Sequence, residues 1–262
     1  MRQVRVVFTE PQSARANISV TAAIAELHVA GESPDTLRLY SYPKSVLLGR
    51  HQPLESINVA ECEKRNVEIA RRLTGGGAIY MDRGVVTWDF IVGTRDFGGG
   101  ITRSISEIGK ALAASLSRFG LPAESKKENE VEIGGKKVCG ISGYYDGATY
   151  VCQGSILVDV DLKQMSSVLR DSRSRGAPAT HEVINIADMM GRRPDNAELF
   201  QTLAVGIAHH FNFTPQRMNL SDAERKLADR LFDEEYGRDQ FVFGEDSRPN
   251  KIRRTEAGRA RA

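Results

Sequence analysis

The stretch from residue 130 to residue 160 most constrains how this chain can fold. Short runs rich in apolar and β-branched residues follow one another there, at 130–133, 137–141, 149–152 and 155–160. Gly134-Gly135 separates the first two runs, which is the composition of a two-residue hairpin turn. Strands joined by such short connections must pair antiparallel, because parallel neighbours need a long crossover. The sequence therefore predicts a meander of antiparallel strands in the middle of the chain.

The rest of the chain mixes strands and helices without a regular βαβ repeat. Further strands are expected at 4–9, 36–42, 45–48, 67–72, 79–80 and 85–92. Apolar residues at helical spacing predict helices at 17–29, 57–65, 101–119, 162–170, 196–210 and 221–233. We therefore predict an α+β fold, in which a mostly antiparallel mixed sheet is flanked by helices.

Composition narrows the class of protein. The net charge is only +2 over 262 residues, so the sequence does not indicate a nucleic-acid-binding protein. Apolar runs stay below the roughly 18–20 residues of a membrane helix, and the N-terminus has too short an apolar stretch for a signal peptide, so we expect a cytoplasmic protein without membrane contact. Cys62, Cys139 and Cys152 lack metal-ligand spacing, and no metal-binding residues are predicted.

A glycine triplet directly after the strand at 67–72 is the first candidate binding element. Gly75, Gly76 and Gly77 follow Arg71-Arg72 after two residues. Ordering three glycines is costly, so they indicate a positive φ or a close approach of backbone to a ligand. Free amides in such a loop can bind carboxylate or phosphate oxygens, and alternation along the strand aims only one of the two arginines at the ligand.

A pair of lysines beside the predicted hairpin turn is the second candidate element. Lys136 and Lys137 should project to opposite faces of their strand, so that one enters a site while the other stays in water. An ammonium group there would neutralise an anionic acyl phosphate. Cys139, two residues after Lys137, should share its face.

Together the two elements resemble the lipoate–protein ligase family over roughly residues 5–235. The shared features are Arg71-Arg72 before Gly75–Gly77, Asn129-Glu130, the hairpin, Lys137-Val138-Cys139-Gly140, Gly154–Asp159 and Asn185, with Leu37–Tyr40 and Val46–Gln52 upstream. The resemblance implies that lipoate and ATP, assisted by Mg²⁺, form lipoyl-AMP and pyrophosphate. The ε-amine of a lysine on a lipoyl-domain or H-protein-like acceptor then attacks the mixed anhydride.

By this resemblance Lys137 is the catalytic residue and stabilises charge, while Arg72 contacts the ligand's anionic groups. The other expected substrate- and ATP-binding residues are Gly75, Gly76, Gly77, Ala78, Tyr80, Met81, Asn129, Glu130, Gly140, Gln153 and Gly154. An apolar slot for the acyl tail is expected from Val46, Leu73, Tyr80 and Val138.

Three positions depart from the family pattern. Met81 replaces a usual histidine, Gln153 replaces another, and Trp88-Asp89-Phe90 replaces an Asn-x-(Ser/Thr) segment. These differences point to a specialised ligase. We expect a catalytic domain at 1–220 and a short C-terminal helix with a basic tail at 221–262, too little for a full accessory domain, so a separate accessory subunit is one expectation.

Two rival functions remain open at this point. An octanoyl or lipoyl transferase of the same fold would work without ATP through a cysteine thioester, which needs an activated thiol. In such relatives the cysteine lies near the position of Pro122, where this chain has none. The other rival is a binding module that kept the fold with weakened catalysis.

Overall fold

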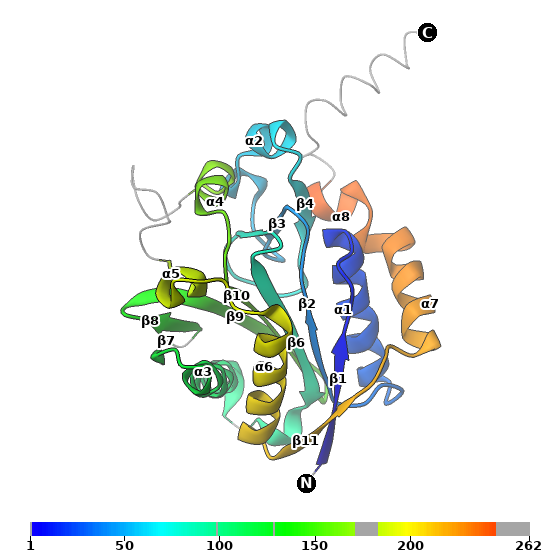
Figure 1. The fold of residues 1–262 in the computed structure, drawn as a ribbon. Helices are drawn as coiled ribbons and strands as arrows, with labels where there is room; N and C mark the ends of the chain where they lie inside the picture. The colour runs from blue at the N-terminus through cyan, green and yellow to red at the C-terminus, as the bar shows by residue number, and fades with distance from the viewer. Residues whose placement is uncertain (1, 98, 128, 171–182, 245–262) are drawn as a thin grey trace.

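The computed structural model describes residues 2–97, 99–127, 129–170 and 183–244 (Figure 1). A loop that the composition of 171–179 predicts, and the basic end of the tail predicted at 221–262, lie outside the described residues. Across the described helices, none combines the length and apolar character needed to cross a bilayer.

The described strands form two sheets. The large sheet has the order β11-β1-β2-β6-β10-β9-β8-β7 and is antiparallel except for the pairs β11–β1 and β1–β2. Its strands are β1 (Arg2–Phe8), β2 (Thr36–Tyr40), β6 (Val85–Gly93), β7 (Ala123–Lys127), β8 (Glu130–Ile133), β9 (Lys136–Asp146), β10 (Thr149–Leu157) and β11 (Phe213–Arg217). The small sheet, β4-β3-β5, consists of β3 (Ser45–Leu48), β4 (Glu68–Arg71) and β5 (Ile79–Met81).

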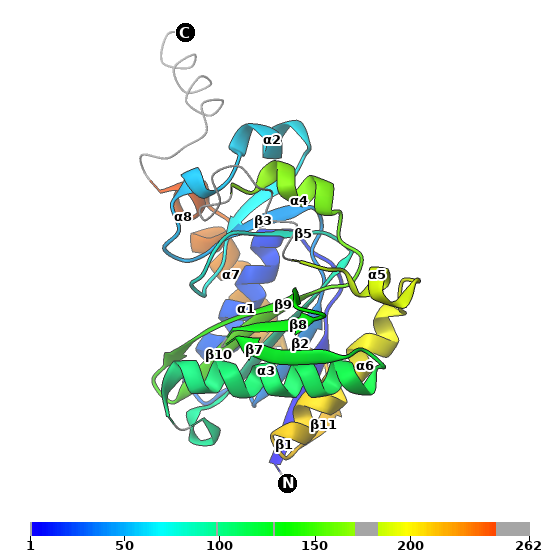
Figure 2. The same ribbon diagram turned by 90° about the vertical axis from the view of Figure 1, so that its left-hand side faces the viewer.

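Helices cover both faces of the large sheet (Figures 1 and 2). One face packs against α3 (Gly100–Arg118) and α6 (Asn196–His210), and the other against α1 (Ala14–Val29), which in turn packs against α7 (Asp222–Leu231). The shorter described elements are α2 (Val59–Lys64), α4 (Leu162–Val168), α5 (Ile186–Met190), α8 (Asp239–Phe243), the 3₁₀ turns η1 (Leu54–Ser56) and η2 (Thr94–Asp96), and the π-helical turn η4 (Phe232–Tyr236). The predicted α+β architecture is therefore confirmed.

Strand β6 shows how the sequence divides the interior into two hydrophobic clusters. Its alternate residues Val86, Trp88, Phe90 and Val92 lie in the first cluster, beneath α3 and α6. Val85 and Ile91 lie in the second cluster, between the large sheet, α1 and the small sheet. Thr87 and Asp89 alternate onto this second face, because successive side chains of a strand point to opposite faces. Polar groups are thus placed inside the second layer.

The structure differs from the predicted elements in two ways: four short elements were not predicted, and two predicted strands are one. Strands β7 and β11 and helices α5 and α8 were not predicted, because each is short and gains its pairing or packing only from distant segments. The two strands predicted at 149–152 and 155–160 are one strand, β10, which pairs with β6 along its whole length. Gly154 lies within this strand because the indole ring of Trp88 packs against it and leaves no room for a side chain. A Cβ built on Gly154 would stand 2.2 Å from the nearest atom of that ring.

The predicted hairpin turn is confirmed and fixes the strand that carries Lys137. Gly134 and Gly135 have φ values of 58° and 77°, which a two-residue turn between twisted strands requires. Ile133 pairs with Lys136 directly across it. The register then shifts between Val131 and Glu132, which leaves Val138 as an extra residue in β9.

Candidate functional site

Arg72 holds the glycine loop, residues 74–77, in shape. Its guanidinium donates to the carbonyl oxygens of Gly75 (2.7 Å), Gly77 (2.8 Å) and Leu47 (3.1 Å). Only 6% of Arg72 is exposed, and burial lowers its pKa to about 10. The contacts seen for Arg72 are therefore with loop backbone, which makes it a clamp on the loop.

A second segment, Gly49–Gln52, packs directly on the glycine loop. A Cβ built on Gly49 would stand 2.0 Å from the carbonyl oxygen of Gly76, so only glycine fits there. The Arg50 amide donates to the Thr74 carbonyl at 2.9 Å. Gly76 itself has φ = 95°, a conformation that glycine adopts without steric cost. The predicted positive φ is present at Gly76, and the close approach that the structure shows is to Gly49 of the protein's own chain.

Beneath the loop runs a buried polar network that begins at Thr74. The Thr74 hydroxyl donates to Gln153 Oε1 at 3.2 Å, and Gln153 Nε2 donates to Asp89 at 2.9 Å. Asp89 also accepts from Thr21 (2.7 Å) and Tyr40 (3.1 Å) and forms an ion pair with Arg38 at 3.4 Å. This network ties the loop to the large sheet and α1.

The charged pair at the end of this network is fully enclosed. Asp89 and Arg38 are both 0% exposed. Burial raises the pKa of Asp89, while Arg38 and the hydrogen bonds from Gln153, Thr21 and Tyr40 oppose that rise. In the sequence, Asp89 stands out only as part of a departure from the family pattern. The signal that would have revealed it is a pair of polar residues at alternate positions of an otherwise apolar strand.

Lys137 stands at the start of β9 with its ammonium group on the same side as the loop. Its Nζ lies 2.9 Å from Glu130 Oε1, and the two side chains are 33% and 15% exposed. A Cβ on Gly140 would lie 3.2 Å from the same Nζ, so glycine at 140 leaves room for the lysine. Three predicted site residues, Lys137, Glu130 and Gly140, are thus brought together.

The register shift at Val138 corrects two expectations from strict alternation. Cys139 was expected to share the face of Lys137, but its side chain lies in the first hydrophobic cluster. Val138 was expected in an apolar slot with Val46 and Tyr80, yet it also packs in the first cluster, whereas those two belong to the second. The extra residue flips the strand, because side chains alternate with a period of two.

Ser142 joins the lysine strand to the glycine loop. Its hydroxyl donates to Thr74 Oγ1 at 2.8 Å. Ser142 and Gly140 share one face of β9, and two residues of strand span roughly 6.6 Å. The glycine loop and the Lys137 group therefore lie side by side across one face of the large sheet.

The remaining predicted residues stand around this centre. Asn129 is exposed, and its carbonyl accepts from the Ile141 amide at 2.9 Å. Ala78 is partly buried, Met81 is buried, and the Tyr80 hydroxyl accepts from Gln164 at 2.8 Å. Tyr80 and Met81 lie in β5, and Ala78 directly precedes that strand. Gly154 turns its Cα hydrogens toward Trp88, so it offers the site only backbone.

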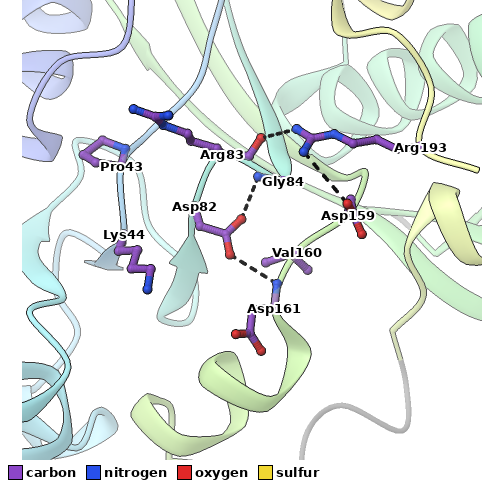
Figure 3. A pocket seen from close by; sticks show the side chains of 9 residues that line it. All are labelled: Pro43, Lys44, Asp82, Arg83, Gly84, Asp159, Val160, Asp161 and Arg193. Atoms are coloured by element: carbon purple, nitrogen blue, oxygen red, sulfur yellow. Dashed lines mark hydrogen bonds and ion pairs between the residues drawn. The ribbon is translucent and has the colours of Figure 1, made fainter.

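A separate pocket of about 610 Å³ opens at the far end of β5 (Figure 3). Asp82 bridges its walls, accepting from the amides of Gly84 (2.7 Å) and Asp161 (3.1 Å). Arg193 donates to the Arg83 carbonyl and pairs with Asp159. None of the catalytic or substrate-binding residues predicted from the sequence lines this pocket. Among its charged side chains, Arg193 and Asp159 form an ion pair with each other at 3.9 Å.

The three thiols are all buried. Cys62, Cys139 and Cys152 are all free and at most 1% exposed. Burial raises the pKa of Cys62 to about 11 and of Cys139 and Cys152 to about 12. A thiol with such a pKa is protonated at neutral pH and is a poor nucleophile.

This geometry defines a class of protein. An α+β domain that sets a glycine loop beside a lysine on a polar sheet face offers backbone amides and one cation to an anionic substrate. The family model of the lipoyl protein ligase A/B catalytic domain matches residues 13–208. The chain belongs to this family, as the motifs of the sequence indicated.

Relatives of two kinds resemble the chain over nearly its full length. It is 28% identical over 255 residues to lipoate-protein ligase A subunit 1 of Thermoplasma acidophilum, covering 91% of this chain and 95% of the relative. It is 25% identical over 268 residues to octanoyltransferase LipM of Symbiobacterium thermophilum, covering 90% and 97%. Sequence similarity therefore places the chain among enzymes of protein lipoylation without separating ligase from transferase.

Solved structures with the same fold are also about 25% identical. A bipartite lipoate protein ligase of T. acidophilum, described with its E2 lipoyl domain, matches with a TM-score of 0.84 over 95% of this chain and 99% of that one. A lipoate-protein ligase A bound with ATP matches with a TM-score of 0.82 over 93% and 99%. A T. acidophilum protein with bound lipoic acid matches with 0.80 over 92% and 99%.

Proposed function

We propose that this chain is the catalytic component of a lipoate–protein ligase, which activates lipoate with ATP and transfers it to a lysine of a lipoyl-domain or H-protein-like acceptor. The observation that carries the proposal is the combination of a partly exposed ammonium group, Lys137, which Glu130 holds beside the glycine loop, with three thiols that are all buried and have raised pKa values. Adenylate chemistry needs a cation and oriented amides, whereas thioester chemistry needs a thiolate.

In the proposed first step a carboxylate oxygen of lipoate attacks the α-phosphorus of ATP. A new bond joins the carboxylate oxygen to the α-phosphorus. The bond between the α-phosphorus and the oxygen that bridges it to the β-phosphate breaks, and pyrophosphate leaves. The amides of Gly75–Gly77 would bind phosphate oxygens, and Lys137 would bind the carboxylate and offset charge as it builds up. Related structures that bind ATP and lipoic acid support these roles.

Mg²⁺ is proposed to enter with the nucleotide. Among the described residues, no group of three or more histidine, cysteine or acidic side chains could hold a metal ion. Magnesium commonly keeps its waters and binds substrate phosphates with only one or two carboxylates from the protein. The donor set of the described residues is compatible with that mode.

In the proposed second step the acceptor lysine amine attacks the lipoyl carbonyl carbon. The amide bond forms, the anhydride bond breaks, AMP leaves, and the amine loses a proton to solvent. Lys137 would stabilise the negative charge on the acyl oxygen and the leaving phosphate. Its role is electrostatic, since an ammonium that holds an anion stays protonated.

The test of this function is pyrophosphate release from ATP, with lipoate and then with a lipoyl domain added. Wild-type protein should release pyrophosphate and add one lipoyl mass to the acceptor. Lys137→Ala should lower the rate by about 10²–10³-fold with unchanged folding, because one preorganised charge contact is lost. Transfer from synthetic lipoyl-AMP without pyrophosphate release would mean that a separate subunit is needed for adenylation.

The rival transferase reaction is tested by removing every thiol. A Cys62→Ala, Cys139→Ala, Cys152→Ser variant retains Lys137 and the glycine loop, and it should keep ATP-dependent ligation. It should also lack any thioester adduct by mass spectrometry. Loss of acyl transfer in the folded variant, with an octanoyl adduct on one cysteine of the wild type, would establish the transferase instead.

The proposed setting is the cytoplasm, with a lipoyl-domain acceptor and a second polypeptide that supports adenylation. The bipartite ligase from T. acidophilum supports the second subunit. We further propose that residues 1–220 form the catalytic unit and that 221–262 form a short C-terminal appendage.

A further inference from the structure

Arg71 makes contacts that neither substrate binding nor catalysis accounts for. Its Nε and Nη2 donate to the Val242 carbonyl of α8 at 3.1 and 2.9 Å. Its Nη1 donates to the carbonyls of Gly49 (2.9 Å), Arg50 (3.3 Å) and Gln52 (2.7 Å). One guanidinium thus joins the C-terminal helix to the segment Gly49–Gln52, which we call the bracing segment.

The bracing segment is in turn packed on the glycine loop. Gly49 meets the Gly76 carbonyl with no room for a side chain, and the Arg50 amide bonds to Thr74. The segment also has an internal hydrogen bond, in which Gln52 Oε1 accepts from the Gly49 amide at 3.2 Å. Any displacement of the bracing segment must therefore be passed to Thr74 and Gly76, because closely packed backbone cannot yield independently.

Helix α8 is anchored firmly enough to serve as the fixed end. Arg15 of α1 donates to the Gly237 carbonyl and to Asp239, both at 2.8 Å. Val242 and Phe243 are buried in the second hydrophobic cluster. The Val242 carbonyl belongs to the last turn of α8, where carbonyls lack helical partners and attract cations. In Figure 1 α8 lies beside β4, which carries Arg71.

Burial disfavours the charged guanidinium of Arg71, so the hydrogen bonds to these carbonyls are needed to hold it in place. Burial, and then the nearby charge of Arg50, lower the pKa of Arg71. A lysine in its place is a single point charge and cannot reach both sets of carbonyls as the planar fork of arginine does. The arrangement therefore depends on arginine at this position.

We propose that Arg71 is a positioning residue through which α8 braces the glycine loop for nucleotide binding. The C-terminal segment thereby supplies, within this chain, support for the loop that receives ATP. The nucleotide part of this inference rests on the proposed function, whereas the bracing of the loop does not.

The bracing is tested first without any substrate, by hydrogen–deuterium exchange of peptides that cover the bracing segment and the glycine loop. Arg71→Ala and deletion of residues 238–262 should each speed exchange at Arg50 and in the loop by about tenfold or more, and Arg71→Lys should give an intermediate gain. Deletion of 245–262 alone, and Arg65→Ala at an exposed ion pair, should leave both peptides unchanged. Faster exchange confined to α8, with the loop unchanged, would overturn the proposal.

The effect on the reaction is measured separately for its two steps. Arg71→Ala should raise the KM for ATP by about 10- to 100-fold, while transfer from synthetic lipoyl-AMP changes by no more than about threefold. Equal losses in both steps, matching a fall in folded protein by circular dichroism, would overturn the positioning role. If wild-type protein lacks ATP-dependent activity, the proposed function fails, yet the exchange experiment still decides whether Arg71 braces the loop.

Discussion

At the scale of single residues, the site depends on polar groups that the fold has taken out of water. Asp89 and Arg38 are an ion pair within the protein interior. Asp89 also accepts from Thr21, Tyr40 and Gln153. The other donors of Arg38 go to Thr9, Asn17 and Thr21. Such a pair adds little net stability over an apolar replacement, but the loss of one member leaves a buried charge without compensation. The members of the network are thus needed together, and the network connects the large sheet to Thr74.

The prediction at this scale concerns Asp89. Asp89→Ala should lower the free energy of unfolding by about 3–5 kcal/mol, because the Arg38 guanidinium stays buried without its counter-ion. Combining it with Arg38→Met should restore most of that loss, since no isolated charge then remains. Urea denaturation followed by circular dichroism measures both variants. A single variant that costs under about 1 kcal/mol, or a double variant that costs more than the single, would contradict the account.

At the scale of elements, short segments are aligned by contacts from distant parts of the chain. Helix α7 docks through Glu224, which takes two hydrogen bonds from Arg5 on β1 and one from Ser33. The same carboxylate accepts from the Ser221 amide at 2.7 Å and closes a capping box with the Ser221 side chain. One buried acid therefore both starts α7 and fastens it to β1.

This docking should make stability depend on pH. Burial by itself would raise the pKa of Glu224, but the hydrogen bonds from Arg5, the Ser221 amide and Ser33 outweigh it and hold the pKa below its usual value. The unfolded chain thus takes up the proton at a higher pH than the folded chain does. The stabilisation is complete above the unfolded pKa of about 4.3 and is lost as the pH falls through the lower folded value.

The measurement compares urea unfolding at about pH 6 and about pH 3.5 for wild type and Glu224→Gln. Wild type should lose more stability than the variant over this interval, since glutamine does not titrate there. Glu198→Gln, on an exposed turn of α6, serves as the control and should follow wild type. Parallel curves for wild type and Glu224→Gln would show that the pair does not contribute to acid sensitivity.

At the scale of the whole molecule, the two hydrophobic clusters share the strands of the large sheet. β6 and β10 each contribute residues to both clusters through alternate positions. The small sheet joins the second cluster through Val46, Leu48 and Tyr80. The glycine loop connects β4 to β5 of this sheet and contacts the large sheet through Thr74, which bonds to Gln153 and Ser142. Neither cluster can be lost without exposing the other face of the same strands, so we expect a single cooperative unit.

The three cysteines test this cooperativity, because they sample both clusters. Cys62 lies in the second cluster and Cys139 and Cys152 in the first. All three should become reactive toward a thiol reagent at the same urea concentration, where the fluorescence of the single tryptophan, Trp88, also changes. Mass spectrometry of the labelled peptides assigns each thiol. Labelling of Cys62 at distinctly lower urea would show that the small-sheet side opens by itself.

Local signals in the sequence were enough for the elements whose structure is decided locally. The hairpin at Gly134-Gly135, the helix that ends before Gly120 and the glycine loop were all predicted at their positions, because turn chemistry and helical periodicity act over a few residues. The family motifs also carried the association of Lys137, Glu130 and Gly140, which the structure brings together.

What the sequence by itself determined is therefore the fold class, the hairpin and the identity of the two motifs. Only the tertiary structure decided the face on which Cys139 and Val138 lie, the enclosure of Asp89 with Arg38, and the link from Arg71 to α8. The physical reason is common to all three. Each depends on a pairing that no local pattern encodes: the register shift on how β9 aligns with β8, the ion pair on two residues 51 positions apart, and the Arg71 guanidinium on a carbonyl 171 positions away.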